Sequence, residues 1–191
     1  ASDVYKRQGH GISAALLMTT VRAFIRSQMA QSGELAQKVT AVNRLLCLDT
    51  FESCDFMTLF LLVIDTVKKE LTWVRAGHDP AFIYDPSNGS INELQGRGTV
   101  LGIDEDWTFE ENKHPKWSEG QIIVIGTDGI WETENPRSEK FGKFRVRQII
   151  RRHSQFSAQE ILKAITDALA AFRDTAPQDD DVTLVVVKAR S

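Results

Sequence analysis

Apolar residues recur at helical spacing in two segments near the start of the chain. In residues 13–28 they lie three and four positions apart, at Ala14, Leu17, Met18, Val21 and Ile25. This spacing places them on one face of a helix. Ser32 precedes a second such segment and is positioned to cap it; the apolar residues there are Leu35, Val39, Val42 and Leu46. The pattern predicts two amphipathic helices, over 13–28 and 32–48.

The middle of the chain changes to short runs rich in β-branched, aromatic and leucyl residues. Residues 56–64 and 71–76 are two such runs, and the charged segment between them indicates a hairpin. Residues 81–84 and 90–94 indicate a second hairpin, because Asn88-Gly89 supplies a tight turn between them. Further strands are expected at 107–110 and 121–125, and the latter is apolar from Ile122 onward, which predicts that both its faces are covered.

Two more helices and a final strand are predicted in the last third of the chain. One helix is expected near 143–152, and a stronger one begins at Ser157, which forms a capping box with Glu160. Residues 182–187 form a β-branched run that predicts a central strand. Helices grouped at both ends of a mainly antiparallel block of strands predict an α+β domain.

Composition excludes several classes of protein. Lys and Arg total 23 of the 191 residues against 26 Asp and Glu, a net charge of −3 that gives no overall attraction to nucleic acid or to an anionic membrane. The longest apolar run, 59–64, is too short to span a membrane. Cys47 and Cys54 are typical of reduced thiols in a cytoplasmic protein.

A local run of basic residues invites a nucleic-acid interpretation. Its members are Arg145, Arg147, Arg151 and Arg152. No interleaved aromatic residues, zinc-ligand spacing or recognition-helix pattern accompanies them. We therefore interpret the run as a solvated helix face or a protein-docking surface, and expect no nucleic-acid partner.

Two acidic clusters lie at the ends of apolar strand segments. Asp128 follows residues 121–125 and is followed by Gly129, which lets a ligand approach the backbone closely; Asp179, Asp180 and Asp181 precede the last predicted strand. Adjacent carboxylates beside an apolar element repel one another unless a cation neutralises them, and Mg²⁺ or Mn²⁺ prefers such oxygen ligands. Each cluster alone is equally explained by a turn or a solvated loop. Together, if their strands are neighbours, they indicate a metal site.

Two histidines stand beside glycine at the ends of predicted elements. Gly9-His10-Gly11 precedes the first helix, where free N–H groups and the helix dipole favour an anion, although a capping loop explains the same residues. His78 follows Gly77 at the end of a predicted strand. It is either catalytic or holds a turn through hydrogen bonds, and we favour the turn.

A succession of motifs matches a known family. In chain order they are Gly9-His10-Gly11 with Ala14-Ala15-Leu16-Leu17-Met18, Phe56-Met57-Thr58-Leu59-Phe60, Ala76-Gly77-His78-Asp79-Pro80, Leu101-Gly102-Ile103, Gly126-Thr127-Asp128-Gly129-Ile130-Trp131-Glu132, Phe141-Gly142 and Gln178-Asp179-Asp180-Asp181-Val182-Thr183. Their combination resembles the SpoIIE branch of the metal-dependent PPM serine/threonine protein phosphatases. The resemblance covers about residues 9–188, nearly the whole chain.

The resemblance implies both a fold and an activity. The fold is an α-β-β-α sandwich of antiparallel sheets flanked by helix pairs, with two Mn²⁺ or Mg²⁺ ions between the sheets. The activity is hydrolysis of phosphoserine or phosphothreonine on a protein, usually a STAS-domain anti-anti-sigma factor in bacterial partner-switching signalling. Such domains commonly follow a sensor or receiver domain. Relatives are often switched by helix movement or dimerisation, so a regulatory face and a homodimer are expected on the helices over 13–28 and 32–48.

Motif matching assigns roles to individual residues. Asp128 and Asp180 match metal ligands, and Asp181 stands where it would orient a metal-bound water. All three are therefore candidate catalytic residues. Gly129, His78 and the Gly9-His10-Gly11 segment are expected to form supporting loops.

The N-terminus departs from the family pattern. Where relatives carry a metal-bridging Asp three residues before Gly9, this chain has Lys6, whose charge would repel cations. Asp3 is a candidate replacement, offset by three residues. We expect residues 1–8 to be foreign to the domain and residues 9–191 to be a phosphatase domain that lacks its first strands. The alternative to an active enzyme is then an inactive phosphatase-like module that binds the same partner without hydrolysis.

Overall fold

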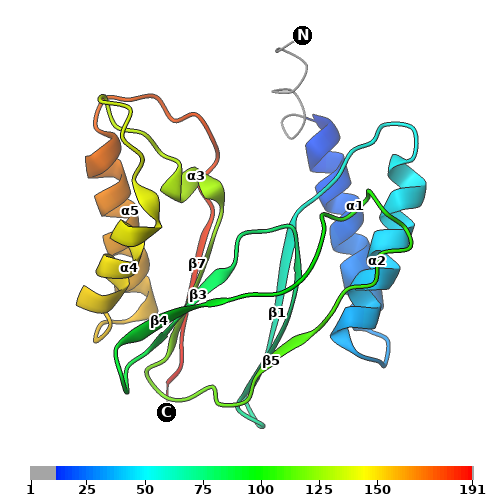
Figure 1. The fold of residues 1–191 in the computed structure, drawn as a ribbon, viewed down its shortest axis with the longest axis horizontal. Helices are drawn as coiled ribbons and strands as arrows, with labels where there is room; N and C mark the ends of the chain where they lie inside the picture. Colours follow the sequence, from blue (N-terminus) through cyan, green and yellow to red (C-terminus); the bar gives the residue numbers. More distant parts are fainter. Residues whose placement is uncertain (1–11, 191) are drawn as a thin grey trace. The chain divides into compact units, whose positions relative to one another are not determined.

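The computed structural model describes residues 12–190, which divide into two compact units. The first unit comprises residues 12–64, 71–78 and 96–114, and the second comprises residues 65–70, 79–95 and 115–190. Figure 1 shows the elements of each unit. Helices and antiparallel sheets make up both units, which confirms the predicted α+β class.

In the first unit a pair of helices packs on a small sheet. The helices are α1 (Ile12–Met29) and α2 (Leu35–Thr50), and the strands are β1 (Leu59–Asp65), β2 (Glu70–Ala76) and β5 (Asn112–His114), in the order β1-β2-β5. The core joins Val21 of α1 and Leu46 of α2 to Val74 of β2, all at most 2% exposed. The apolar stripes in the sequence are therefore the faces that these helices bury against the sheet, except that Met18 of α1, predicted on the same face, is 56% exposed.

In the second unit a four-stranded antiparallel sheet is covered by another pair of helices. The strands are β3 (Ala81–Asp85), β4 (Ser90–Leu94), β6 (Ile122–Gly126) and β7 (Leu184–Lys188), in the order β4-β3-β6-β7. The helices are the short α3 (Asp128–Trp131), α4 (Gly142–Arg152) and α5 (Ala158–Arg173). Phe82 of β3 and Val124 of β6 pack in one core with Ile150 of α4 and Ile165 of α5.

Local sequence signals locate several of these elements accurately. The hairpin of β3 and β4 forms as predicted, with Ala81 opposite Leu94 and Asp85 opposite Ser90. Ser157 caps α5 as predicted, since its hydroxyl accepts a hydrogen bond from the Glu160 amide while its own amide donates to the Glu160 carboxylate. Among the helices of residues 12–190, none combines the length and apolarity needed to cross a membrane.

Three expectations from the sequence are wrong. The cap of α2 is Glu34, which forms a reciprocal capping box with Gln37, and not Ser32. Residues 107–110 form no strand, because the Phe109 amide donates to the hydroxyl of Thr40 on α2 at 3.1 Å and Phe109 itself fills the helix–sheet core. Strand β7 pairs with β6 alone among the described strands, so it lies at a sheet edge, and only one of its faces, with Leu184 and Val186, packs in the core that contains α5.

Candidate metal site at the ends of two paired strands

The two acidic clusters lie at the same end of the sheet in the second unit. Strands β6 and β7 pair antiparallel, with Gly126 at the end of β6 opposite Leu184 at the start of β7. Asp128 comes two residues after β6, and Asp181 comes three residues before β7. The condition set by the sequence, that the strands beside the clusters be neighbours, is met.

Thr127 ties the two acidic segments together. Its amide donates to the carbonyl of Thr183 at 3.1 Å, and its hydroxyl accepts a hydrogen bond from the Thr183 amide at 3.0 Å. The same hydroxyl donates to the carbonyl of Asp181 at 3.2 Å. Backbone pairing thus extends beyond the strands and fixes the start of one acidic segment against the end of the other.

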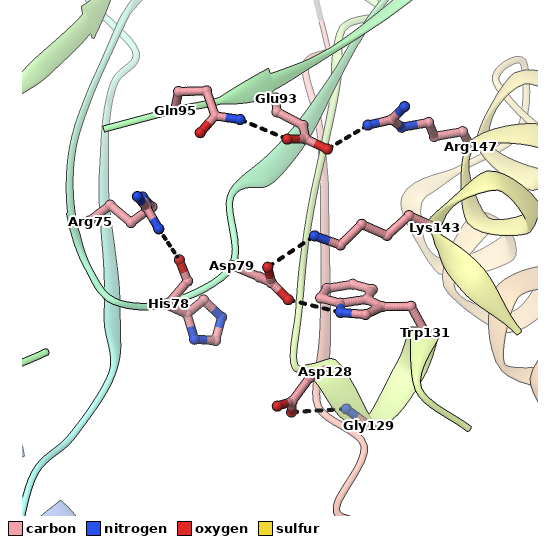
Figure 2. Close-up of polar contacts among 10 residues, drawn as sticks. All are labelled: Arg75, His78, Asp79, Glu93, Gln95, Asp128, Gly129, Trp131, Lys143 and Arg147. Atoms are coloured by element: carbon pink, nitrogen blue, oxygen red, sulfur yellow. Dashed lines mark hydrogen bonds and ion pairs between the residues drawn. The ribbon is translucent and has the colours of Figure 1, made fainter. Parts of the chain in front are cut away.

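Gly129 allows the segments to approach closely. A Cβ atom at this position would lie 2.4 Å from the Asp181 carbonyl oxygen, closer than real Cβ atoms come to other heavy atoms. The Gly129 amide also donates to Oδ1 of Asp128 at 3.0 Å, as Figure 2 shows. In the facing segment, the Asp181 amide donates to Oδ1 of Asp180 at 2.7 Å. Each carboxylate is therefore oriented by a backbone amide through one of its oxygens.

The carboxylates of this site are open to solvent. Asp128, Asp180 and Asp181 are all exposed, so their oxygens are accessible to a cation or a phosphorylated ligand. Within residues 12–190, no group of three or more His, Cys, Asp or Glu side chains is arranged to hold a metal ion. The remaining predicted site residues, Asp3 and Gly9-His10-Gly11, lie outside the described residues.

His78 lies in the first unit and makes the contacts of a turn residue. Its Nδ1 lies 3.3 Å from the hydroxyl of Thr58, and its carbonyl accepts a hydrogen bond from the Arg75 guanidinium at 3.0 Å. Arg75 also donates to the carbonyl of Gly96 at 2.8 Å, so one guanidinium joins two loop segments. These contacts favour the turn-holding interpretation of His78.

An anchor that sequence reasoning missed holds the helix α3, which begins at Asp128. Trp131 ends α3 and is buried, and its indole Nε1 donates to Oδ2 of Asp79 at 2.8 Å. Oδ1 of Asp79 pairs with Nζ of Lys143 on α4 at 2.9 Å, and that ammonium group lies 4.9 Å from the Trp131 ring centre. Figure 2 shows the Asp79 carboxylate in contact with both partners. The residue that follows His78 in the sequence thus connects α4 to the helix that carries Asp128.

Two variants of Asp79 are expected to distinguish the contribution of the indole hydrogen bond to stability from that of the ion pair with Lys143. Asp79→Ala leaves a buried indole N–H without its partner, which should lower the free energy of unfolding by about 1–3 kcal/mol. Asp79→Asn retains an oxygen that can accept from the indole and loses only the ion pair with Lys143, whose two side chains are each 32% exposed, so a smaller loss is expected. Urea denaturation followed by tryptophan fluorescence measures both. Equal losses in the two variants would show that the indole hydrogen bond contributes nothing.

Basic residues of the run on α4 make hydrogen bonds and ion pairs within the second unit. Arg147 pairs with Glu93 of β4, as Figure 2 shows. Arg145 donates to the carbonyls of Lys140 and Phe141 just before the helix and lies over the Phe172 ring. These contacts agree with a solvated, structurally engaged helix face.

Comparison with known proteins agrees with this architecture. The chain is 30% identical over 185 residues to the phosphoserine phosphatase RsbU of Bacillus subtilis (strain 168), a match that covers 95% of the chain and 53% of RsbU. The chain thus spans about half the length of that relative.

Two solved structures show the same fold. The SiaA-PP2C domain of Pseudomonas aeruginosa superposes with a TM-score of 0.82 at 21% identity, over 94% of this chain and 72% of that one. The catalytic domain of the serine/threonine phosphatase PstP, in complex with two manganese ions, superposes with a TM-score of 0.63 at 13% identity, over 95% and 85% of the two chains. The family model of stage II sporulation protein E (SpoIIE) matches residues 4–190, and the chain therefore belongs to the SpoIIE family.

Proposed function

We propose that this chain hydrolyses phosphoserine or phosphothreonine on a protein, with Mn²⁺ or Mg²⁺ bound at Asp128 and Asp180. The observation that carries the proposal is the contact of Gly129 with the Asp181 backbone, which brings the two acidic segments together at one end of paired strands. The relative RsbU bears the name phosphoserine phosphatase, and PstP of the same fold was solved with two manganese ions. Both names support this activity and these metals.

The donor set fits a hard divalent cation. Carboxylate oxygens are the ligands that Mg²⁺ and Mn²⁺ select, and these sites usually keep several waters. Asp128 and Asp180 each have one oxygen engaged with a backbone amide, a contact that orients the carboxylate. The described residues supply only part of a coordination sphere. We therefore propose Asp3 as a further ligand, in place of the bridging Asp that relatives carry at the position of Lys6.

The chain's own residues have distinct tasks in this proposal. When bound, the cations would lower the pKa of a water molecule and neutralise charge on the phosphoryl group. Asp128 and Asp180 would hold the cations, and Asp181 would orient the attacking water. Thr127 and Gly129 hold the two segments at a fixed separation. The family resemblance also implies supporting loops at Gly9-His10-Gly11 and His78. No nucleophilic side chain is required, because the attacking group is water.

The substrate we propose is a phosphorylated STAS-domain anti-anti-sigma factor in the bacterial cytoplasm. RsbU and a second relative, RsbP of Bacillus subtilis (22% identical over 185 residues), both carry the name phosphoserine phosphatase. A sensor or receiver domain in the longer protein and homodimerisation through α1 and α2 would then regulate the activity.

The deciding experiment measures phosphate release from a phosphoserine STAS-domain protein with Mn²⁺ and with EDTA, together with binding of that protein. Release that requires Mn²⁺ supports the enzyme. Binding without release, from a chain that circular dichroism shows to be folded, would contradict hydrolysis and support the alternative, a module that only binds. Binding without phosphate release is the result expected if Lys6 prevents metal binding.

A further inference from the structure

A groove in the first unit is lined by none of the residues assigned to metal binding in the sequence. It has a volume of about 800 Å³ and opens between the end of α2 and the loop 102–105. Leu48 and Phe51 line it from the helix side, and Ile103, Asp104 and Glu105 line it from the loop. Nothing in the proposed phosphatase reaction uses these residues.

The apolar residues of this groove are unusually exposed. Phe51 is 84% exposed, Leu48 is 70% exposed and Ile103 is 61% exposed. Single exposed apolar residues are ordinary on a protein surface, but several large ones gathered around one groove are typical of an interaction site. Covering them would remove apolar surface from water, which favours association.

The walls of the groove are held in place before any partner binds. Asn43 of α2 is fully buried, and its Nδ2 donates to the Asp104 carbonyl at 2.7 Å while its Oδ1 accepts from the Gly102 amide at 2.9 Å. The hydroxyl of Thr50 lies 3.2 Å from the Gly102 carbonyl and donates to it. Because the helix and loop are already joined, a partner that enters the groove would lose little free energy to ordering it.

The two chain segments that line the groove carry only negative charge. Segments 45–56 and 101–107 contain no Lys or Arg, and their acidic residues are Asp49, Glu52, Asp55, Asp104, Glu105 and Asp106. Burial, together with the negative charges of Glu105 and Asp104, raises the pKa of the Cys47 thiol on the groove wall. A negative rim repels nucleic acid and anionic membranes and attracts cations.

We propose that this groove docks a segment of a partner protein that presents large apolar side chains flanked by Lys or Arg. The apolar side chains would pack against Phe51, Leu48 and Ile103, while the basic residues would pair with the acidic rim. Apolar anchors supply most of the affinity at such surfaces, and complementary charge supplies specificity and faster association. This docking site is independent of the phosphatase reaction, because it shares no residue with the proposed metal site.

A pair of synthetic peptides tests the proposal. One carries leucine at helical spacing with lysine at the other positions, and the other has glutamate in place of each lysine. Binding is measured by fluorescence anisotropy at low and high salt, and amide chemical shifts locate the bound peptide on the ¹⁵N-labelled chain. We expect the lysine peptide to bind, to weaken severalfold at high salt, and to shift resonances of residues 47–56 and 102–105. The glutamate peptide should not bind.

Matched variants identify the groove as the site. Phe51→Ser and Ile103→Ser should each weaken binding of the lysine peptide about tenfold. Val67→Ser changes a side chain that is 90% exposed and lies outside the groove, so it should leave binding unchanged. The double variant Asp104→Asn with Glu105→Gln removes two negative charges from the rim of the groove, and an asparagine at 104 still accepts a hydrogen bond from the Asp106 amide. Glu119→Gln removes a negative charge outside the groove and is the control for this loss of charge.

Three results would overturn the proposal. Equal binding by groove variants and their controls would show that the peptide binds elsewhere. Chemical-shift changes confined to the acidic segment 179–181 would show that the peptide binds there through charge alone and does not enter the groove. Concentration-dependent shifts of the groove resonances without peptide would show that a second copy of the chain occupies it.

Discussion

Replacing Asp128 by asparagine is expected to reduce Mn²⁺-dependent phosphate release by more than about a hundredfold, since even outer partners of metal ligands contribute tenfold to a hundredfold. The amide has the size of the carboxylate and keeps an oxygen that accepts from the Gly129 amide at 3.0 Å, so helix α3 should still begin at this residue. The substitution removes the negative charge that a cation requires. Phosphate release measured over a range of Mn²⁺ concentrations gives the loss of activity and of metal affinity.

Asp179→Asn is the matched control for this variant. Asp179 belongs to the same acidic run and is exposed like its neighbours, but no metal or water role is proposed for it. It should release phosphate at close to the unmodified rate. Equal activity of Asp128→Asn and Asp179→Asn would refute the metal site at Asp128, whereas unchanged binding of the STAS-domain protein by Asp128→Asn would separate docking from hydrolysis.

The main elements of this fold are predictable because their signals are local. The stripe of apolar residues through Val21 and Ile25 specifies the buried side of α1, and Ser157 with Glu160 specifies the start of α5 within four residues. The proximity of the two acidic clusters also follows from sequence, once β6 and β7 are taken as neighbours. Their charges lie next to apolar strand ends, and strand pairing then fixes which ends meet.

The connections between distant segments were not predictable in the same way. Asp79 precedes Trp131 by 52 positions and Lys143 by 64, and no periodic pattern marks these two polar contacts, which form only when the second unit is folded. Asn43 contacts the loop 102–104 across about sixty positions, so the groove it builds has no sequence signature. The prediction of β7 as a central strand failed for a related reason. A β-branched run is equally typical of a strand buried on one face and of a strand buried on both.

The contact between Gly129 and Asp181 suggests a more sensitive test of the site than removal of a ligand. A Cβ at position 129 would lie 2.4 Å from a backbone oxygen and 3.1 Å from its carbon, and a backbone carbonyl cannot rotate aside as a side chain can. The two segments must separate to accept it, against the Thr127 hydrogen bonds that join them. Overpacking of this kind costs about 1–3 kcal/mol of folding free energy.

Gly129→Ala is therefore expected to lower phosphate release about a hundredfold, because displacement of catalytic groups by about 1 Å has effects of that size. All the acidic side chains remain, so Mn²⁺ affinity should fall less steeply than in Asp128→Asn. Phosphate release and Mn²⁺ titration measure the two effects separately.

Gly89→Ala controls for stability in the Gly129→Ala experiment. Gly89 has a φ of +67° and nothing within 4 Å of the added methyl group, so alanine there adds backbone strain of about 1–2 kcal/mol without a clash. Both variants should unfold at lower urea concentrations than the unmodified chain, but only Gly129→Ala should lose phosphate release. Full activity in Gly129→Ala would mean that the spacing of the two acidic segments does not matter to catalysis, and the site would have to be placed elsewhere on the chain.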